Sequence, residues 1–111
     1  MIRTVLNLYP KSNEQSPVIE YFLEKQVLEH SSRTIGFIAA ELFTPLESGP
    51  MLVTATWEDL NAYNRWVNDP WRGQSSELLA KLLDQDLNSK TKGSIFRLIH
   101  AVSSNSPLGT T

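Results

Sequence analysis

Two kinds of hydrophobic periodicity follow one another along the chain, and their order restricts the fold more than any single residue does. Stretches in which apolar and polar residues alternate are typical of strands, whereas apolar residues that recur every three to four positions are typical of helices. The 111 residues show these patterns in the order strand, helix, strand, strand, helix, helix, strand. This order predicts one α+β domain, a ferredoxin-like four-stranded antiparallel sheet with helices on one face.

The predicted strands cover residues 2–9, 35–43, 51–57 and 94–102. Pro10 ends the first strand, because proline lacks the N–H that a sheet requires. The second and third strands flank a turn that contains Ser48-Gly49, so we expect them to form an antiparallel hairpin. In the first strand the side chains divide between two faces, Ile2, Leu6 and Leu8 on one and Arg3, Val5, Asn7 and Tyr9 on the other.

Three helices are predicted between these strands. Ser16 and Pro17 suit the N-cap and the first position of a helix that runs to near residue 31. Asp59 suits the N-cap of a short helix that ends at Asp69-Pro70, because the residue before a proline avoids helical backbone angles. The apolar stripe of the third helix consists of Leu78, Leu79, Leu82 and Leu83.

The composition excludes several classes of function. The chain has no cysteine, so disulfides, thiolate nucleophiles and thiolate metal sites are excluded. A formal net charge of −2 provides no basic surface for a nucleic acid. The two histidines lack metal-ligand spacing, so no metal is expected. No apolar run approaches the roughly 20 residues of a membrane helix, and the start is too polar for a secretion signal. We therefore expect a cytoplasmic protein that binds neither membrane nor nucleic acid.

One face of the predicted sheet lacks a cover. We expect a single domain over residues 1–103 and a flexible polar tail over residues 104–111, and this domain has helices enough for one face only. Val5, Asn7 and Tyr9 on the other face are too apolar for open water and too polar for a sealed core. A second subunit or a ligand is therefore expected there.

Two segments resemble the antibiotic biosynthesis monooxygenase family. The first is a strand ending in Thr54-Ala55-Thr56-Trp57-Glu58-Asp59, with Tyr63 six residues after the tryptophan and a stop at Asn68-Asp69-Pro70. The second runs from Gly36-Phe37 to Glu41-Leu42 and is similar to the family's Pro-Gly-Phe-x-x-x-Glu-Leu strand, with Ile35 in place of the proline. The resemblance covers about residues 2 to 102. It implies a dimeric α/β barrel, hence a homodimer.

The family implies two templates for the site. In members that oxidise anthrones with molecular oxygen and no cofactor, a tryptophan and a tyrosine match Trp57 and Tyr63, whereas the asparagine position holds Val53 and the arginine position Glu77 or Leu79. In haem-degrading members, an asparagine and a tryptophan match Asn7 and Trp66. Their axial histidine position holds Ser75 and Ser76.

These comparisons give a set of candidate site residues. The catalytic candidates are Asn7, Trp57, Tyr63 and Trp66, and the substrate-binding candidates are Val5, Tyr9, Arg72 and His100. Each has a structural alternative: Tyr63 and Trp66 fall on the apolar stripe of their helix, and His100 is typical of a half-buried strand residue. His30 is interpreted as a cation that stabilises the end of its helix.

Three functions remain open. The leading hypothesis is a cofactor-independent monooxygenase that oxidises an electron-rich aromatic or polyketide-type small molecule with molecular oxygen. In that scheme Trp57 and Trp66 form apolar walls, and Tyr63 and Asn7 donate hydrogen bonds to a forming oxyanion. The alternatives are a haem-binding or haem-degrading relative and a non-catalytic dimer that binds a small molecule.

Overall fold

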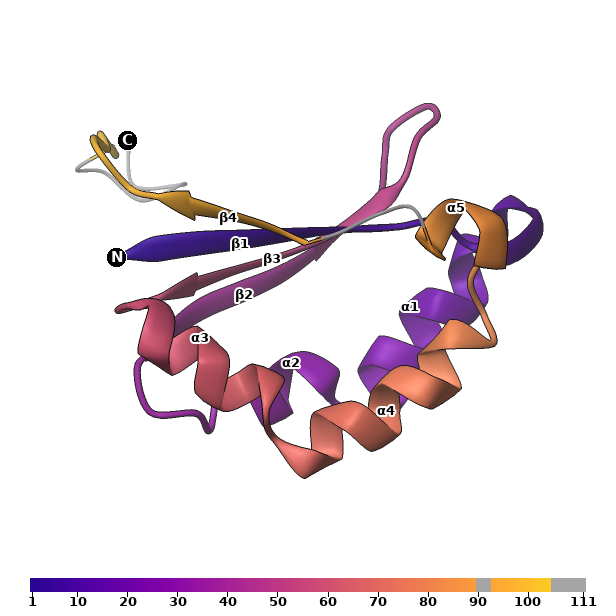
Figure 1. Ribbon diagram of the computed structural model, residues 1–111. Coiled ribbons are helices and arrows are strands. Elements are labelled where there is room, and N and C mark those ends of the chain that lie inside the picture. The colour runs from indigo at the N-terminus through magenta and orange to yellow at the C-terminus, as the bar shows by residue number, and fades with distance from the viewer. Residues whose placement is uncertain (90–92, 105–111) are drawn as a thin grey trace.

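The strands and helices form two separate layers in this computed structural model, which describes residues 1–89 and 93–104 (Figure 1). The four strands are β1 (Ile2–Leu8), β2 (Phe37–Phe43), β3 (Met51–Trp57) and β4 (Ser94–Arg97). They form one antiparallel sheet in the order β2-β3-β1-β4. The predicted ferredoxin-like α+β fold is confirmed, with the helices gathered beneath one face of the sheet.

The helix layer is divided more finely than the sequence predicts. It contains α1 (Gln15–Glu24), α2 (Val27–Ser31), α3 (Leu60–Val67), α4 (Pro70–Ala80) and α5 (Gln85–Ser89), and a 3-10 turn at Lys11–Asn13 precedes α1. The single helix predicted over residues 16–31 is wrong, because Gln26 adopts left-handed angles with φ of 51° and separates α1 from α2. None of the helices in the described part of the chain is long and apolar enough to span a membrane.

The helix boundaries follow the capping residues in two cases out of three. Asp59 caps α3 by accepting a hydrogen bond from the backbone N–H of Ala62 at 2.9 Å, as predicted. Asp69 follows α3 and caps α4 through the N–H of Trp71 at 2.8 Å, with Pro70 as the first helical residue. The predicted cap at Ser16 is wrong, since α1 begins at Gln15, two residues before the predicted first position Pro17, and its N-cap, Glu14, forms no side-chain capping bond.

The last predicted helix and strand are both shorter than expected. Leu82 and Leu83 lie beyond the end of α4, and Leu83 is buried beside Pro10 in an isolated bridge. Strand β4 ends at Arg97 because its partner β1 begins at Ile2, which pairs with that residue. The short helix α5 was not predicted. The predicted tail lies outside the described residues from 105 onward.

Side chains on the two faces of the sheet have opposite environments. Leu8, Met51 and Trp57 point toward the helices and are each at most 2% exposed. On the other face Phe43 and Phe96 are 49% and 56% exposed. No described helix covers this face of the sheet (Figure 1). It also carries polar pairs, since Arg3 donates to Thr56 and Thr54 donates to Glu41. The strands therefore have one sealed face and one mixed face, with exposed aromatic rings, that no helix covers.

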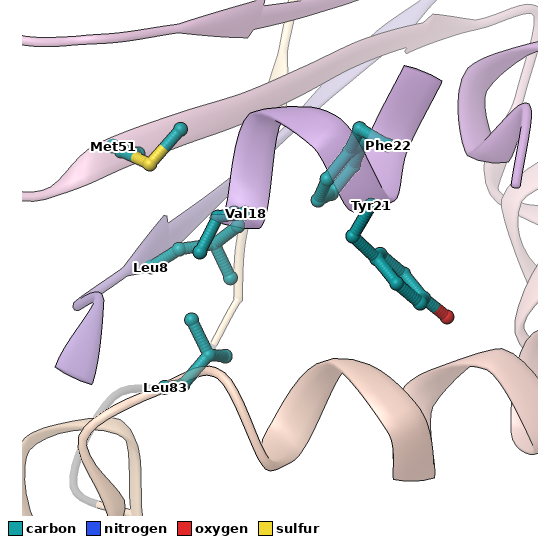
Figure 2. Packing of buried hydrophobic residues seen from close by; sticks show 6 residues of the cluster. All are labelled: Leu8, Val18, Tyr21, Phe22, Met51 and Leu83. Carbon is teal, nitrogen blue, oxygen red and sulfur yellow. The ribbon is translucent and has the colours of Figure 1, made fainter. Parts of the chain in front are cut away.

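The sealed face holds two separate hydrophobic clusters. The larger lies between α1 and the ends of β1 and β3, and Figure 2 shows its buried members Leu8, Val18, Tyr21, Phe22, Met51 and Leu83. The smaller lies under α3 and consists of Ala55, Trp57 and Ala62 with partly buried neighbours, among them Tyr63 and Trp66. The helix layer thus packs on the sheet at two places along the strands.

Gly36 allows α3 to approach the sheet closely. Its φ of 93° lies in the region that favours glycine, and a Cβ built there would lie 2.5 Å from the Cβ of Ala62. Its carbonyl also accepts a hydrogen bond from the backbone N–H of Glu58 at 2.8 Å. The residue before β2 therefore sets how closely the helix with Tyr63 and Trp66 approaches the sheet.

Replacing Gly36 with alanine should lower the free energy of unfolding by about 3 kcal/mol, because backbone strain and overpacking against Ala62 add. Gly49 is a matched control, since its φ of 125° is also positive but a Cβ there meets nothing within 4 Å. Gly49→Ala should cost about 1 kcal/mol. Urea denaturation at one fixed protein concentration measures both values. Equal losses would contradict the close approach.

Candidate functional site

A cavity of about 150 Å³ lies between the sheet and the helices, in the gap between the two hydrophobic clusters. Its floor is a row of small side chains across three paired strands, because Ala40 of β2 pairs with Ala55 of β3, which pairs with Thr4 of β1. The flanking rows are larger: Leu42, Val53 and Leu6 on one side, and Phe37, Trp57 and Ile2 on the other. The hollow therefore results from the order of small and large residues along the three strands.

The end of the cavity near Trp57 is aromatic. The Trp57 ring is 1% exposed and packs edge-on against Phe37, with ring centroids 5.5 Å apart, and near Tyr63, at 5.9 Å. Its indole Nε1–H donates a hydrogen bond to the hydroxyl oxygen of Thr4 at 3.3 Å. Trp57 is thus fixed in place by contacts on three elements, β1, β2 and α3.

Two polar groups in the cavity wall have no partner among the described residues. The Tyr63 hydroxyl of α3 forms no hydrogen bond there, and the Arg72 guanidinium of α4 forms neither a hydrogen bond nor an ion pair. Both side chains are half-buried. A guanidinium beside an apolar cavity attracts an anion, and a phenol can donate to an oxygen atom.

Helix α2 supplies the remaining wall with Val27, Leu28 and Ser31. Ser31 is 4% exposed, and its hydroxyl donates a hydrogen bond to the backbone carbonyl of Leu28 at 2.6 Å. Because this proton is already used, the Ser31 oxygen faces the cavity region only as an acceptor. This wall differs from the sequence-based expectation, because residues 27–31 were predicted to continue the preceding helix.

A group of neighbouring aromatic rings lies beside the cavity. The imidazole of His30 stacks on the indole of Trp71 with ring centroids 3.7 Å apart, and Trp71 lies 6.1 Å from Trp66, a cavity residue. The earlier interpretation of His30 as only a helix-end cation is incomplete, because its ring face is covered by Trp71. In the sequence, Trp66 and Trp71 lie five positions apart on either side of Asp69-Pro70, and this spacing could have indicated that the two indoles lie close together.

The structure brings together four of the predicted site residues, because Trp57, Tyr63, Trp66 and Arg72 all line the cavity. Val5 also borders the cavity, but it follows the floor residue Thr4 in β1, so its side chain lies on the other face of the sheet. Asn7, Tyr9 and His100 do not line it. His100 is exposed and lies three residues beyond the end of β4, so its predicted position in the strand is wrong. The carbonyl of Tyr9 instead accepts from the N–H of Asp84 at 2.7 Å.

Asn7 lies on the other face of the sheet. It pairs with Leu52, whereas its neighbour Leu8 pairs with the buried Met51 on the helix side. Because successive strand residues point to opposite faces, the expectation that Asn7 shares a cavity with Trp57 is wrong. The amide belongs to the uncovered face, where the alternation in the sequence had placed it.

The position that matches the haem-ligating histidine holds a buried structural contact. Ser75 is 9% exposed, and both its carbonyl and its hydroxyl lie within hydrogen-bond distance of the Tyr21 hydroxyl, at 2.6 and 2.5 Å. In Figure 2 the Tyr21 ring extends from α1 toward the helix below it. The hydroxyl of Ser76 donates to the carbonyl of Arg72 at 2.7 Å. Among the residues described, no group of three His, Cys, Asp or Glu side chains could hold a metal ion.

The fold is similar to that of several solved structures, although no protein-family model and no curated protein sequence matches the chain. SnoaB, a cofactor-independent oxygenase from Streptomyces nogalater, matches with a TM-score of 0.72 and 15% identity over 93% of this chain and 98% of that one. MhuD, a heme-degrader from Mycobacterium tuberculosis, matches with a TM-score of 0.72 and 14% identity over 93% and 100%.

A third match is a Deinococcus radiodurans protein with the provisional name antibiotic biosynthesis monooxygenase. Its TM-score is 0.75, with 15% identity over 94% of this chain and 98% of that one. At such identities the likeness establishes the fold, which the chain shares with these three proteins over nearly its whole length. Because one fold supports several chemistries, the site has to be argued from its own residues.

Replacing Tyr21 with phenylalanine should lower the free energy of unfolding by about 1–3 kcal/mol, because two buried atoms of Ser75 lose their partner. Tyr63→Phe is a matched control, and it should change stability by less than about 0.5 kcal/mol. Urea denaturation of Tyr21→Phe, Ser75→Ala and the double variant gives the coupling energy. A coupling near zero would contradict the contact between α1 and α4.

Proposed function

We propose that this chain is a cofactor-independent monooxygenase of the antibiotic biosynthesis monooxygenase type, which oxidises an electron-rich aromatic small molecule with molecular oxygen. The observation that carries the proposal is the pair formed by the Tyr63 hydroxyl and the Arg72 guanidinium, both without partner among the described residues, in the wall of an aromatic and aliphatic cavity. The shared fold with a cofactor-independent oxygenase supports it.

Such a reaction needs little from the protein beyond binding, charge stabilisation and exclusion of water. An anionic phenol or enol is rich enough in electrons to reduce dioxygen itself. A C–O bond then forms, the O–O bond breaks, one oxygen atom becomes a carbonyl of the product and the other leaves as water. The substrate loses four electrons and dioxygen gains four, so no further reductant enters the balance.

The cavity residues suit these tasks. Arg72 favours the anionic form of the substrate, because a guanidinium stabilises a nearby negative charge. Tyr63 donates a hydrogen bond to the oxygen on which charge develops. Trp57 and Trp66 provide flat apolar walls for an aromatic ring and keep water away from the reacting carbon.

The residues present do not fit haem. A cavity of about 150 Å³ holds about one benzene ring, far less than a porphyrin. At the matching ligand position the Ser75 hydroxyl is buried against Tyr21, and a serine hydroxyl is a poor iron ligand compared with imidazole. No step of the proposed reaction therefore passes through this group.

We further propose that two copies pair through the uncovered face of the sheet. Phe43 and Phe96 are exposed on this face, and Asn7 and Val5 lie between them in the strand order. Apolar side chains on an open sheet face are typical of an interface. In this assembly Asn7 lies between subunits, which accounts for an amide in a strand.

Light scattering should give twice the chain mass of 12.5 kDa. Because unfolding then dissociates the subunits, the thermal midpoint should rise with protein concentration. Phe43→Lys should favour the monomer by placing a charge in the interface. The proposed dimer would be contradicted if wild type is a monomer at micromolar concentration and its thermal midpoint does not change with protein concentration.

Replacing Tyr63 with phenylalanine should lower turnover by roughly 100-fold, because a donor to the developing oxyanion is lost. The assay is oxygen uptake after exhaustive chelation, with a panel of hydroxylated aromatic acids and anthrone-type compounds. Asn61→Ala is the control, since Asn61 is exposed on the same helix and does not line the cavity. If wild type is no faster than buffer with every compound, the oxygenase proposal falls and a non-catalytic binding protein remains.

A further inference from the structure

The size of the cavity restricts the ligand more strongly than its chemistry does. An engineered apolar cavity of about 150 Å³ in another protein accommodates one benzene molecule, and the cavity here has the same volume. Its sheet-side walls cannot retreat easily, because Leu6 and Val53 also pack against the larger hydrophobic cluster. Trp57 and Tyr63 are held in the smaller one. The space between the two clusters therefore matches one aromatic ring.

Thr4 provides a hydrogen-bond donor at the floor of the cavity. The Trp57 indole N–H can only donate, so in their 3.3 Å contact the Thr4 oxygen must be the acceptor. The Thr4 hydroxyl proton has no acceptor among the described residues. Trp57 therefore leaves this proton free to be donated to a ligand in the cavity. A ligand oxygen at the floor is the matching group.

The charged group of the cavity comes from the opposite layer. Arg72 belongs to α4 and Thr4 belongs to β1, which Figure 1 shows in the helix layer and the sheet respectively. A guanidinium binds a carboxylate through two parallel hydrogen bonds. A carboxylate is therefore a better ligand group for Arg72 than a group that offers a single oxygen atom. Ser31, whose own proton is used by Leu28, offers no competing donor.

Resting on the proposed function, we propose that the substrate is a one-ring aromatic acid, a benzene ring that carries a carboxylate and a hydroxyl or phenolate oxygen. The ring lies over the row formed by Ala40, Ala55 and Thr4. The carboxylate binds Arg72, and the ring oxygen accepts the Thr4 proton. Anthrones and other fused tricyclic compounds are excluded by size.

A calorimetric titration with a size series tests the ring count. The probes are 3-hydroxybenzoate, 3-hydroxy-2-naphthoate and anthracene-2-carboxylate, all at the same pH and none dependent on turnover. The one-ring acid should bind at least about 10-fold more tightly than the two-ring acid, and the three-ring acid should not bind. Tighter binding of either larger acid would overturn the proposal. Ala55→Val places a larger side chain at the floor of the cavity, so this variant should bind 3-hydroxybenzoate more weakly than wild type does.

Thr4→Val tests the donor, because valine keeps the shape of threonine and removes the hydroxyl. It should weaken 3-hydroxybenzoate by about 10-fold, the effect of one hydrogen bond of about 1.4 kcal/mol. Benzoate, which lacks the ring oxygen, should bind wild type and Thr4→Val equally and thereby shows that the variant pocket is intact. Thr4→Ser should bind 3-hydroxybenzoate as wild type does. An equal loss for both ligands would overturn the role of Thr4.

Binding and oxygen uptake separate this inference from the proposed function. If one-ring acids bind as described but no hydroxylated one supports oxygen uptake, the proposed oxygenase activity is contradicted. The proposed ligand class is then still supported. Oxygen uptake with anthrone-type compounds, together with no binding of one-ring acids, would contradict the ligand class and leave the oxygenase standing.

Discussion

The pairing of β1 with β3 is the constraint on which the rest of the structure depends. These two strands form the centre of the sheet, and their register places Leu8 beside Met51 and Ile2 beside Trp57 on the helix side. Because side chains alternate along a strand, a slip of β1 by one residue would move Leu8 and Ile2 to the open face, away from Met51 and Trp57. The same register lays Thr4 beside Ala55 at the floor of the cavity and directs Asn7 away from it.

The cavity follows from the contrast between neighbouring rows of side chains in this sheet. Where a row contains large residues, such as Phe37 and Trp57, the helix above packs against it directly. The row of Ala40, Ala55 and Thr4 is too short to reach the helices, so the space above it stays open. The hollow thus arises from side-chain size, while Ala40, Ala55 and Thr4 stay paired across the three strands.

The order of elements and the faces of β1 could be predicted from sequence, because alternation and capping residues such as Asp59 and Asp69 act locally. Trp57, Tyr63 and Trp66, which the resemblance to the family singled out, line one cavity, and their roles there stay predictions. The left-handed turn at Gln26 could not be predicted, since glutamine has no preference for it and the break is set by packing. Thr4 was missed for a similar reason, since its role as a donor depends on the contact with Trp57, which lies 53 positions away.

The break at Gln26 gives the cavity walls unequal resistance to opening. The strands, α3 and α4 form three of the walls, and both helices begin at an aspartate that forms a side-chain capping bond. The fourth wall is α2, a five-residue helix with no side-chain capping bond. Helices this short have little stability of their own, so their hydrogen bonds break in local fluctuations well before the domain unfolds. A ligand thereby gains a route past Leu28 and Ser31 while the sheet stays intact. We therefore expect α2, rather than the sheet, to be the wall that moves when a ligand enters.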